Sequence, residues 1–300
     1  MTTRQITVAH LYPDVMSTYG DRGNVAAIVR RCRWRGVGVS VTELRPSEKV
    51  VPDDVDLIMI GGGGESRQRQ VAADLYKVKG GAIRDAVAAG TAVLAVAGGY
   101  ELFGLFCQPE NGAELRGIEV FNSWTIHRRE DADYSGATAN DGPPARSRSA
   151  QTIRDLVVRW RGGVLVGFEN SRGRTYLGTG AVPLGRVVCG RGNNGDGSEG
   201  VRLGGAVGTN MRGPCLPANP ALADFLISAA LRHRYGLADL APLADDLELA
   251  ARTAAMQRTV LTARRRVLAW PLRKQAAPSA GVEMTTRSRL GMRLRAGLHR

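Results

Sequence analysis

The sequence has no apolar run long enough to cross a membrane. Its longest apolar stretch, Ala92–Phe106, is interrupted by Gly98, Gly99 and Glu101, whereas a membrane-spanning helix needs about 20 consecutive apolar residues. The N-terminal residues also show no charged region followed by an apolar stretch and a cleavage site. Without these signals we expect a cytoplasmic protein whose thiols are reduced.

Cysteine and aromatic residues are scarce. Aromatic residues make up 5% of the chain, and its four cysteines form no CxxC pair and have no histidine at metal-ligand spacing, so neither a zinc site nor a cofactor is expected. The glycine-rich stretch Gly190–Gly197 lacks the GK[ST] ending of a phosphate-binding loop. His10 and His127 are interpreted as structural histidines. The four cysteines are Cys32, Cys107, Cys189 and Cys215.

Acidic residues are nearly absent from the end of the chain. The last 49 residues, Arg252–Arg300, contain 12 Lys and Arg but one acid, Glu283, and so account for +11 of the net charge of +13. The first 251 residues are close to neutral, so no nucleic-acid partner is expected for them. We expect Gln275–Arg300 to be a disordered tail, whose contact with a membrane surface or another polyanion is an open alternative.

The first half of the sequence alternates between strands and helices. Continuous apolar runs such as Asp56–Ile60 are typical of parallel strands buried on both faces. The alternation predicts an α/β fold, in which helices flank an open, mostly parallel sheet with its ligand site at the carboxyl ends of the strands. Strands are expected at Gln5–Tyr12, Val37–Leu44, Asp56–Ile60 and Ala92–Val96, with helices from a cap at Asn24 to about Arg35, over Ala82–Ala89 and from Tyr100.

Short alternating segments from Gly117 to about Val188 predict antiparallel strands that extend this sheet. Helices at about Ala221–Tyr235 and Leu247–Ala269 follow them. We divide the chain into one domain over residues 1–250 and a basic helical extension with a tail over residues 251–300. The later strands are expected at Gly117–Thr125, Thr152–Trp160, Leu165–Glu169, Thr175–Gly178 and Gly204–Gly208.

A strand followed by two glycines, Val93–Gly99, has the form of a nucleophile elbow. In such an elbow a sharp turn after a buried strand presents one side chain above the sheet, and the next backbone N–H helps to bind an oxyanion. The glycine run after Ile60 would bring further amides to the same place if the geometry of a family with this kind of elbow holds. The backbone amides of Gly62, Gly63 and Gly98 are therefore candidate substrate-binding groups, and ordinary turn structure is the alternative for both segments.

Motifs spread over about residues 5–250 resemble one family. The elbow segment Val93–Gly104 resembles that of the glutamine amidotransferase subunit of lipid II isoglutaminyl synthase (GatD family). This is a class I glutaminase-like fold that is also related to the CobB/CobQ-like amidotransferase domains of cobyric acid synthase. The motifs occur along the chain in the family's order. The other segments are Leu11–Asn24, Cys32–Gly36, Ile60–Gly63, Gly167–Asn170, Pro183–Gly185, Gly192–Gly195, Gly208–Thr209, Gly213–Pro214 and Asn219–Pro220.

The resemblance implies one half of a two-subunit enzyme. The amidotransferase subunit would hydrolyse glutamine and pass ammonia to a Mur-ligase-like partner. That partner would use ATP to amidate the α-carboxyl of D-glutamate in lipid II, the peptidoglycan precursor. The family's chemistry needs a thiolate at the elbow and a histidine that takes its proton and later protonates ammonia.

The sequence departs from the family at both of these positions. Ala97 stands where the family has the cysteine, and a methyl group cannot form a glutamyl thioester. Arg212 stands where the family has the histidine, and a guanidinium stays protonated and has no acceptor for a proton. Asp133 falls where the family has an arginine that would hold the glutamine carboxylate. No catalytic residue of the family is therefore expected to be intact.

Three functions are consistent with these residues. The favoured one is a pseudoenzyme, a structural or regulatory subunit bound to a Mur-ligase-like protein in cell-wall precursor metabolism. The second is an active subunit that uses another nucleophile, or one that is fed with free ammonia through its partner. None of the four cysteines stands at the end of a buried strand before two glycines, which disfavours a replacement nucleophile. The third is a polyanion-binding module that acts through the basic tail.

Overall fold

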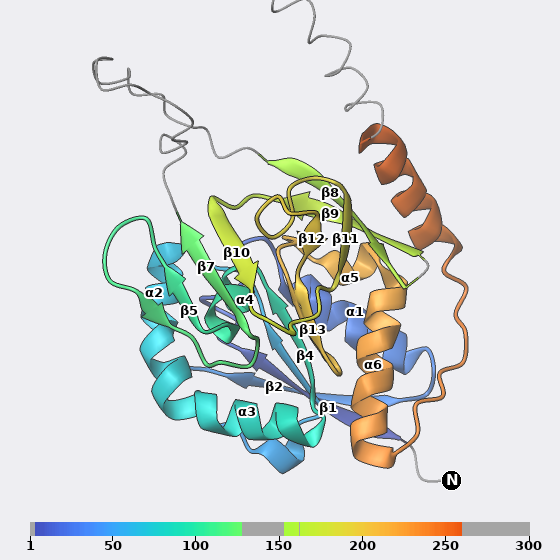
Figure 1. Ribbon diagram of the computed structural model, residues 1–300. Coiled ribbons are helices and arrows are strands. Elements are labelled where there is room, and N and C mark those ends of the chain that lie inside the picture. The colour runs from blue at the N-terminus through green and yellow to red at the C-terminus, as the bar shows by residue number, and fades with distance from the viewer. Residues whose placement is uncertain (1–3, 128–152, 162, 260–300) are drawn as a thin grey trace, which may run out of the picture. The chain divides into compact units, whose positions relative to one another are not determined.

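The computed structural model describes residues 4–127, 153–161 and 163–259 (Figure 1). These residues belong to one compact unit, Met1–Thr259. Predictions for Asp133, for the end of the helix expected at Leu247–Ala269 and for the tail at Gln275–Arg300 lie outside the described residues. The division of the chain at residue 250 stays a prediction.

The main sheet has six strands and confirms the expected α/β fold. Five of them are parallel, and β13 at one edge is antiparallel to its neighbour. Chain order and spatial order differ, because the crossover connections of parallel strands allow a strand to pair with one that is not its neighbour in the sequence. In spatial order the strands are β13 (Val201–Leu203), β14 (Ala206–Thr209), β4 (Ala92–Val96), β3 (Leu57–Ile60), β1 (Gln5–Leu11) and β2 (Gly38–Leu44).

Most of the later strands form two separate four-stranded sheets, so the expectation that they extend the main sheet is wrong. Alternating polar and apolar residues identify a strand but not its partner, and β13 already occupies the edge beside β14. The first additional sheet contains β10 (Gly173–Leu177), β7 (Ser123–His127), β5 (Phe106–Gln108) and β6 (Leu115–Arg116); the second contains β12 (Ser198–Glu199), β11 (Gly185–Cys189), β8 (Arg154–Trp160) and β9 (Gly163–Glu169).

The segment expected as one strand at Gly117–Thr125 is also different. β6 ends at Arg116 and β7 begins at Ser123. Glu119 between them has a φ of 61°, which is the left-handed region and is incompatible with a continuous strand. The intervening residues therefore form an irregular segment with a bend at residues 120–122.

Helices cover both faces of the main sheet. Along β3, Leu57 and Met59 belong to a core with α1 (Arg22–Arg33) and α6 (Pro220–Tyr235), whereas Ile58 and Ile60 belong to a core with α2 (Glu65–Asp74) and α3 (Gly80–Ala89). Successive side chains of a strand point to opposite faces, so a fully apolar strand serves two cores. The remaining elements are η1 (Pro52–Asp54), the π-helical segment η2 (Leu75–Lys79), α4 (Gly98–Phe103), α5 (Cys215–Ala218) and a helix at residues 246–259.

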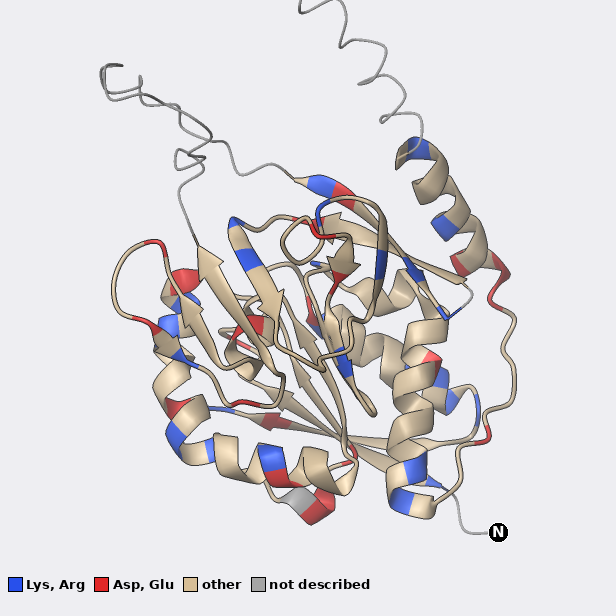
Figure 2. Cartoon of the chain, viewed as in Figure 1, with Lys and Arg blue, Asp and Glu red and all other residues tan. Residues whose placement is uncertain are grey.

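Two helix predictions need correction. α1 begins at Arg22, so Asn24 lies inside the helix and does not cap it; its Oδ1 accepts a hydrogen bond from the N–H of Leu216 at 2.9 Å. α4 begins at Gly98 rather than at Tyr100. α2 and α3 carry both basic and acidic side chains (Figure 2), as expected for a nearly neutral body.

Candidate functional site

Four neighbouring parallel strands end at the same edge of the main sheet. β1, β3, β4 and β14 lie next to one another and run in the same direction. The segments that follow them begin at Tyr12, Gly61, Ala97 and Asn210. Because ligand sites of open α/β sheets lie beyond the carboxyl ends of the strands, this edge is the candidate site.

Ala97 occupies a tight turn between β4 and α4. Its φ of 49° and ψ of −113° are unusual for a residue with a side chain, and the residue is 1% exposed. Such backbone strain costs about 1–3 kcal/mol and is found mostly at functional sites. The carbonyl of Ala97 accepts a hydrogen bond from the N–H of Glu101 at 2.9 Å. The turn has the form of a nucleophile elbow, with a methyl group where the nucleophile would stand.

Two glycines allow this turn to pack against the loop after β3. A Cβ atom on Gly98 would lie 2.4 Å from the carbonyl oxygen of Gly63, and one on Gly99 would lie 2.8 Å from that of Gly61. Contacts this short exclude any side chain at either position. The structure thus brings the expected residues Gly63 and Gly98 together beside the elbow.

The amide of Gly62 lies at the same edge but already has a partner. Its N–H donates to Oδ2 of Asp21 at 2.9 Å. A Cβ atom on Gly62 would lie 3.4 Å from that of Ala97, so the residue does border the elbow. An N–H that donates to a carboxylate is not free to bind an oxyanion. Gly63 and Gly98 are therefore the better candidates for that role.

Asp21 is a buried carboxylate of the site for which the sequence indicated no role. Burial raises its pKa to about 6, while the N–H of Gly62 and the charge of Arg212 act in the opposite direction. Its Oδ1 has no hydrogen-bond partner among the described residues. A carboxylate in this place could orient a histidine at position 212, as the acid of a catalytic triad does. The sequence signal that could have indicated a role for Asp21 was its position in Leu11–Asn24, a segment that resembles the family.

The charge of Arg212 acts on two buried acidic groups of the site, Asp21 and Glu101. Its Cζ is 5.4 Å from the centroid of the Tyr19 ring, and its backbone N–H donates to the carbonyl of Phe168 at 2.8 Å. Its Nε is buried without a hydrogen-bond partner among the described residues. The structure therefore places a permanent positive charge beside Asp21.

Glu199 holds the segment that leads from β14 to Arg212. Its Oε1 accepts hydrogen bonds from Oγ1 of Thr209 at 2.8 Å and from the N–H of Asn210 at 2.7 Å. The side chain is fully buried, and burial raises its pKa to about 7 despite these hydrogen bonds. A second buried carboxylate thus fixes the backbone at this strand end.

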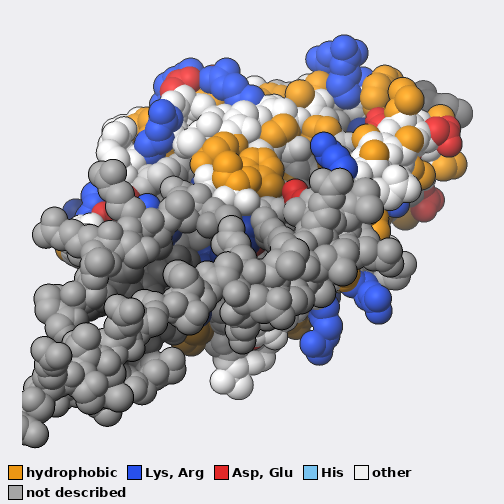
Figure 3. All heavy atoms as spheres, turned by 90° about the horizontal axis from the view of Figure 1, so that it is seen from above, with side chains coloured by type: hydrophobic (Ala, Val, Ile, Leu, Met, Phe, Trp, Pro, Cys, Tyr) orange, Lys and Arg blue, Asp and Glu red, His pale blue; other side chains and the backbone are white. Residues whose placement is uncertain are grey.

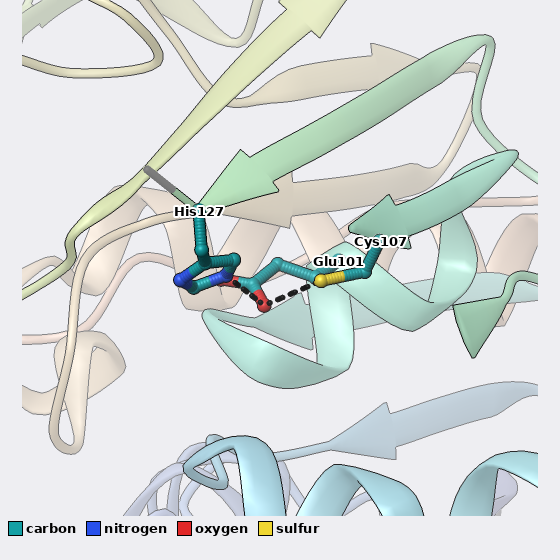
Figure 4. A group of neighbouring side chains, drawn as sticks. All are labelled: Glu101, Cys107 and His127. Carbon is teal, nitrogen blue, oxygen red and sulfur yellow. Dashed lines mark hydrogen bonds and ion pairs between the residues drawn. The ribbon is translucent and has the colours of Figure 1, made fainter. Parts of the chain in front are cut away.

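Glu101 on α4 lies at the centre of a polar cluster (Figure 4). Its Oε2 lies 3.1 Å from Nε2 of His127 and accepts hydrogen bonds from Nε2 of Gln68 at 2.8 Å and from Sγ of Cys107 at 3.5 Å. Burial opposes the charge of Glu101, but the charge of His127, the hydrogen bonds with His127 and Gln68 and the charge of Arg212 hold its pKa below the usual value. Burial likewise opposes the charge of His127, yet Glu101 raises the pKa of that imidazole.

None of the four cysteines stands at the elbow. Cys32, Cys107 and Cys215 are buried, and burial raises the pKa of each thiol, for Cys32 and Cys215 to about 12. Cys189 is half-buried on β11. Because the thiolate is the reactive form of cysteine, a buried protonated thiol is a poor nucleophile.

A cavity of about 920 Å³ lies away from this site, at the amino ends of β4 and β14. Gly90 and Gly205 border it where the two strands begin, and α6 and the end of β8 supply much of the remaining wall. It shares no residue with the elbow or with the polar groups around it. The cavity is therefore separate from the candidate site.

Within the described part of the chain, no helix is long and apolar enough to span a bilayer.

Known proteins resemble this chain over most of its length. Residues 7–220 match the family model of the CobB/CobQ-like glutamine amidotransferase domain. The GatD subunit of lipid II isoglutaminyl synthase (glutamine-hydrolyzing) from Staphylococcus aureus (strain N315) is 30% identical over 232 residues, which are 77% of this chain and 86% of that protein. The subunit of the same name from Streptococcus pneumoniae (strain ATCC BAA-255 / R6) is 29% identical over 246 residues, or 81% and 87%.

Solved structures give weaker matches. PurLQS from Thermotoga maritima is similar at 15% identity with a TM-score of 0.44, covering 78% of this chain and 99% of that chain. A glutamine amidotransferase from the same organism gives 12% identity and a TM-score of 0.41, covering 87% of this chain and 94% of that chain.

On the family match and the two curated relatives, the chain belongs to the CobB/CobQ-like glutamine amidotransferase domain family.

Proposed function

We propose that this protein is a GatD-like subunit that works with a Mur-ligase-like partner in the amidation of lipid II and does not itself hydrolyse glutamine. Both curated relatives are subunits of lipid II isoglutaminyl synthase, which supports the substrate and the partner. In this proposal the partner binds ATP and lipid II. The subunit would work in the cytoplasm and would be structural or regulatory.

The observation that carries the proposal is the methyl side chain of Ala97 in a complete elbow. The strained backbone, the two glycines after it and the neighbouring backbone of Gly63 are all present. Glutaminase chemistry of this family begins when a thiolate attacks the amide carbon and expels ammonia. A methyl group has no electron pair to donate, so this step has no nucleophile at the turn.

Arg212 removes the second requirement. A general base must accept a proton near neutral pH, and a guanidinium has neither an acceptor nor an accessible neutral form. Two independent losses at the two positions of one mechanism favour a subunit that no longer uses it. The retained strain at the elbow supports a function that depends on the shape of this edge rather than on acylation.

Co-purification with the partner tests the proposal. The protein and the Mur-ligase-like protein of the same organism are expressed together, and the complex is assayed for ammonia release from glutamine and for lipid II amidation with glutamine or ammonium as nitrogen source. We expect a stable complex with ammonia release at the buffer background. The Staphylococcus aureus relative with its own partner is the positive control for the assay.

The outcomes separate the candidate functions. Ammonia release well above background, or the failure of any Mur-ligase-like protein to bind, contradicts the proposal. Amidation of lipid II that uses ammonium and does not depend on glutamine would support the ammonia-fed alternative. In that alternative the subunit supports its partner without hydrolysing glutamine itself.

The polyanion-binding alternative depends on residues outside the described part of the chain. On the described part of the face seen in Figure 3, Lys and Arg side chains stand in separate groups among hydrophobic and uncharged side chains. This arrangement gives no support to a polyanion-binding surface on the described part of this face. Binding to polyanions with a steep salt dependence, lost on deletion of residues 275–300, would support the alternative.

A further inference from the structure

We propose that Glu101, Cys107 and His127 form a binding site for a divalent transition-metal ion, for which Zn²⁺ is the best match. This proposal does not rest on the proposed function. One carboxylate oxygen, one sulfur and one ring nitrogen lie within 4.8 Å of one another. The three side chains come from three different elements and point toward one another (Figure 4).

The distances between these ligand atoms suit a tetrahedral ion. Zinc bonds of about 2.0–2.3 Å place neighbouring ligand atoms of a tetrahedron about 3.3–3.7 Å apart. Oε2 of Glu101 lies 3.5 Å from Sγ of Cys107 and 3.1 Å from Nε2 of His127. An ion would replace these two hydrogen bonds, and the sulfur and the ring nitrogen, which lie within 4.8 Å of each other, would have to come within the same spacing.

The pairing of β5 with β7 explains why the sulfur and the imidazole meet. The two strands are parallel, and Cys107 lies opposite Thr125. His127 is two residues beyond Thr125, so it lies on the same face of the sheet and diagonal to Cys107. Glu101 reaches the same face from α4, the helix that follows the elbow.

Gly173 on β10 makes room for the imidazole. It lies opposite His127 in the antiparallel pair of β10 and β7. A Cβ atom at position 173 would lie 2.8 Å from Nε2 of His127. The absence of a side chain there lets the ring lie across the neighbouring strand, with its Nε2 toward Glu101.

The donor set selects the class of ion. A thiolate and a carboxylate together balance the charge of a divalent ion, although the charge of Arg212, which acts on both Glu101 and His127, partly opposes binding. Mg²⁺ and Ca²⁺ prefer oxygen ligands, whereas a thiolate with an imidazole suits Zn²⁺ and related ions. Binding would release the proton of the Cys107 thiol.

The cluster is open to solvent at His127 alone among its three ligands. Glu101 and Cys107 are buried, but the side chain of His127 is 19% exposed. A zinc ion with three protein ligands keeps one position for water or another small ligand. The amide of Gln68 donates to the same Oε2 of Glu101 at 2.8 Å, and such hydrogen bonds commonly orient metal ligands.

Cobalt and zinc titrations of the full-length protein test the site. Protein without an affinity tag is treated with a chelator, dialysed and titrated with Co²⁺, which reports a thiolate ligand by a charge-transfer absorption. We expect one equivalent of Co²⁺ to bind with this band and Zn²⁺ to displace it, whereas Mg²⁺ does not. Cys107→Ser should abolish the band, and His127→Gln should weaken binding at least about tenfold.

Matched variants outside the cluster are the controls. Cys189→Ser and His233→Gln change the same residue types elsewhere and should leave the band and the affinity unchanged. Circular dichroism checks that each variant is folded, and the wild-type spectrum alone decides the outcome if Cys107→Ser does not fold. A wild-type protein that binds Co²⁺ without a thiolate band, or a band that survives in folded Cys107→Ser, overturns the proposal.

Discussion

The N–H of Ala97 donates a 2.8 Å hydrogen bond to the carbonyl of Thr209. This bond joins the elbow to the strand end that leads to Arg212. The hydroxyl of Thr209 in turn donates to the buried carboxylate of Glu199. Ala97 and the segment that leads from β14 to Arg212 are therefore held in one hydrogen-bonded frame.

Gly98→Ala should destabilise the protein by at least about 2 kcal/mol, because the new Cβ would lie 2.4 Å from the carbonyl oxygen of Gly63. The free energy of unfolding from urea denaturation measures the effect. Gly64→Ala is the matched control, since a Cβ there meets nothing within 4 Å. It should change stability by less than about 1 kcal/mol. Equal effects of the two substitutions would contradict the close packing at the elbow.

Asn219→Ala should cost about 3 kcal/mol or more. The fully buried Asn219 side chain accepts a hydrogen bond from the N–H of Val166 at 2.8 Å and donates to the carbonyls of Val166 at 2.8 Å and Cys215 at 2.7 Å. Truncation leaves these backbone groups unsatisfied inside the protein. Thermal and urea denaturation measure the loss.

Asn122→Ala provides the comparison for Asn219. Its exposed side chain donates one hydrogen bond, to the carbonyl of Thr179 at 3.1 Å. Its replacement should cost about 1 kcal/mol or less. If truncation of Asn219 costs no more than truncation of Asn122, the link between β9 and α5 is not important for stability.

The stabilisation that the protonated form of Glu199 gives to the folded protein should be lost as the pH rises. Its pKa in the folded state is raised from 4.5 to about 7 by burial, so the folded protein binds this proton more tightly than the unfolded chain does. The resulting stabilisation is complete below about pH 4.5 and is lost as the pH rises through 7, by up to about 3 kcal/mol. Glu199→Gln cannot titrate and should flatten the dependence of unfolding free energy on pH between 5 and 8. Parallel curves for the two proteins would exclude this assignment.

Much of the fold could be predicted from the sequence because its strongest patterns are local. The apolar runs at Leu57–Ile60 and Ala92–Val96 have the composition of strands buried on both faces, and both are central strands of the main sheet. α2 was missed because Glu65–Asp74 is rich in Arg, Gln and acidic residues and has too few apolar residues to show a helical period. The partners of the later strands depend on contacts between distant segments, which periodicity does not report.

The elbow was predictable for the same reason, since a buried strand followed by Gly98 and Gly99 is a local pattern. The polar surroundings were not. Asp21 reaches the site from the segment after β1, and its contact with Gly62 joins residues 41 positions apart. Cys107 and His127 also escape rules of metal-ligand spacing, because strand pairing and not a short loop brings them together.

Substitution of Ala97 and Arg212 by the two residue types that glutaminase chemistry needs tests the central claim most directly. Glutaminase activity is measured for the wild-type complex, for Ala97→Cys and for the double variant Ala97→Cys/Arg212→His, with Asp21→Asn added to the double variant as a check on the carboxylate. A general base commonly contributes a factor of about 10²–10⁴, so the double variant should release ammonia at least about tenfold faster than Ala97→Cys. The wild type should stay at background, and Asp21→Asn should lower the restored activity. A wild-type complex that releases ammonia from glutamine as fast as the double variant would contradict the account.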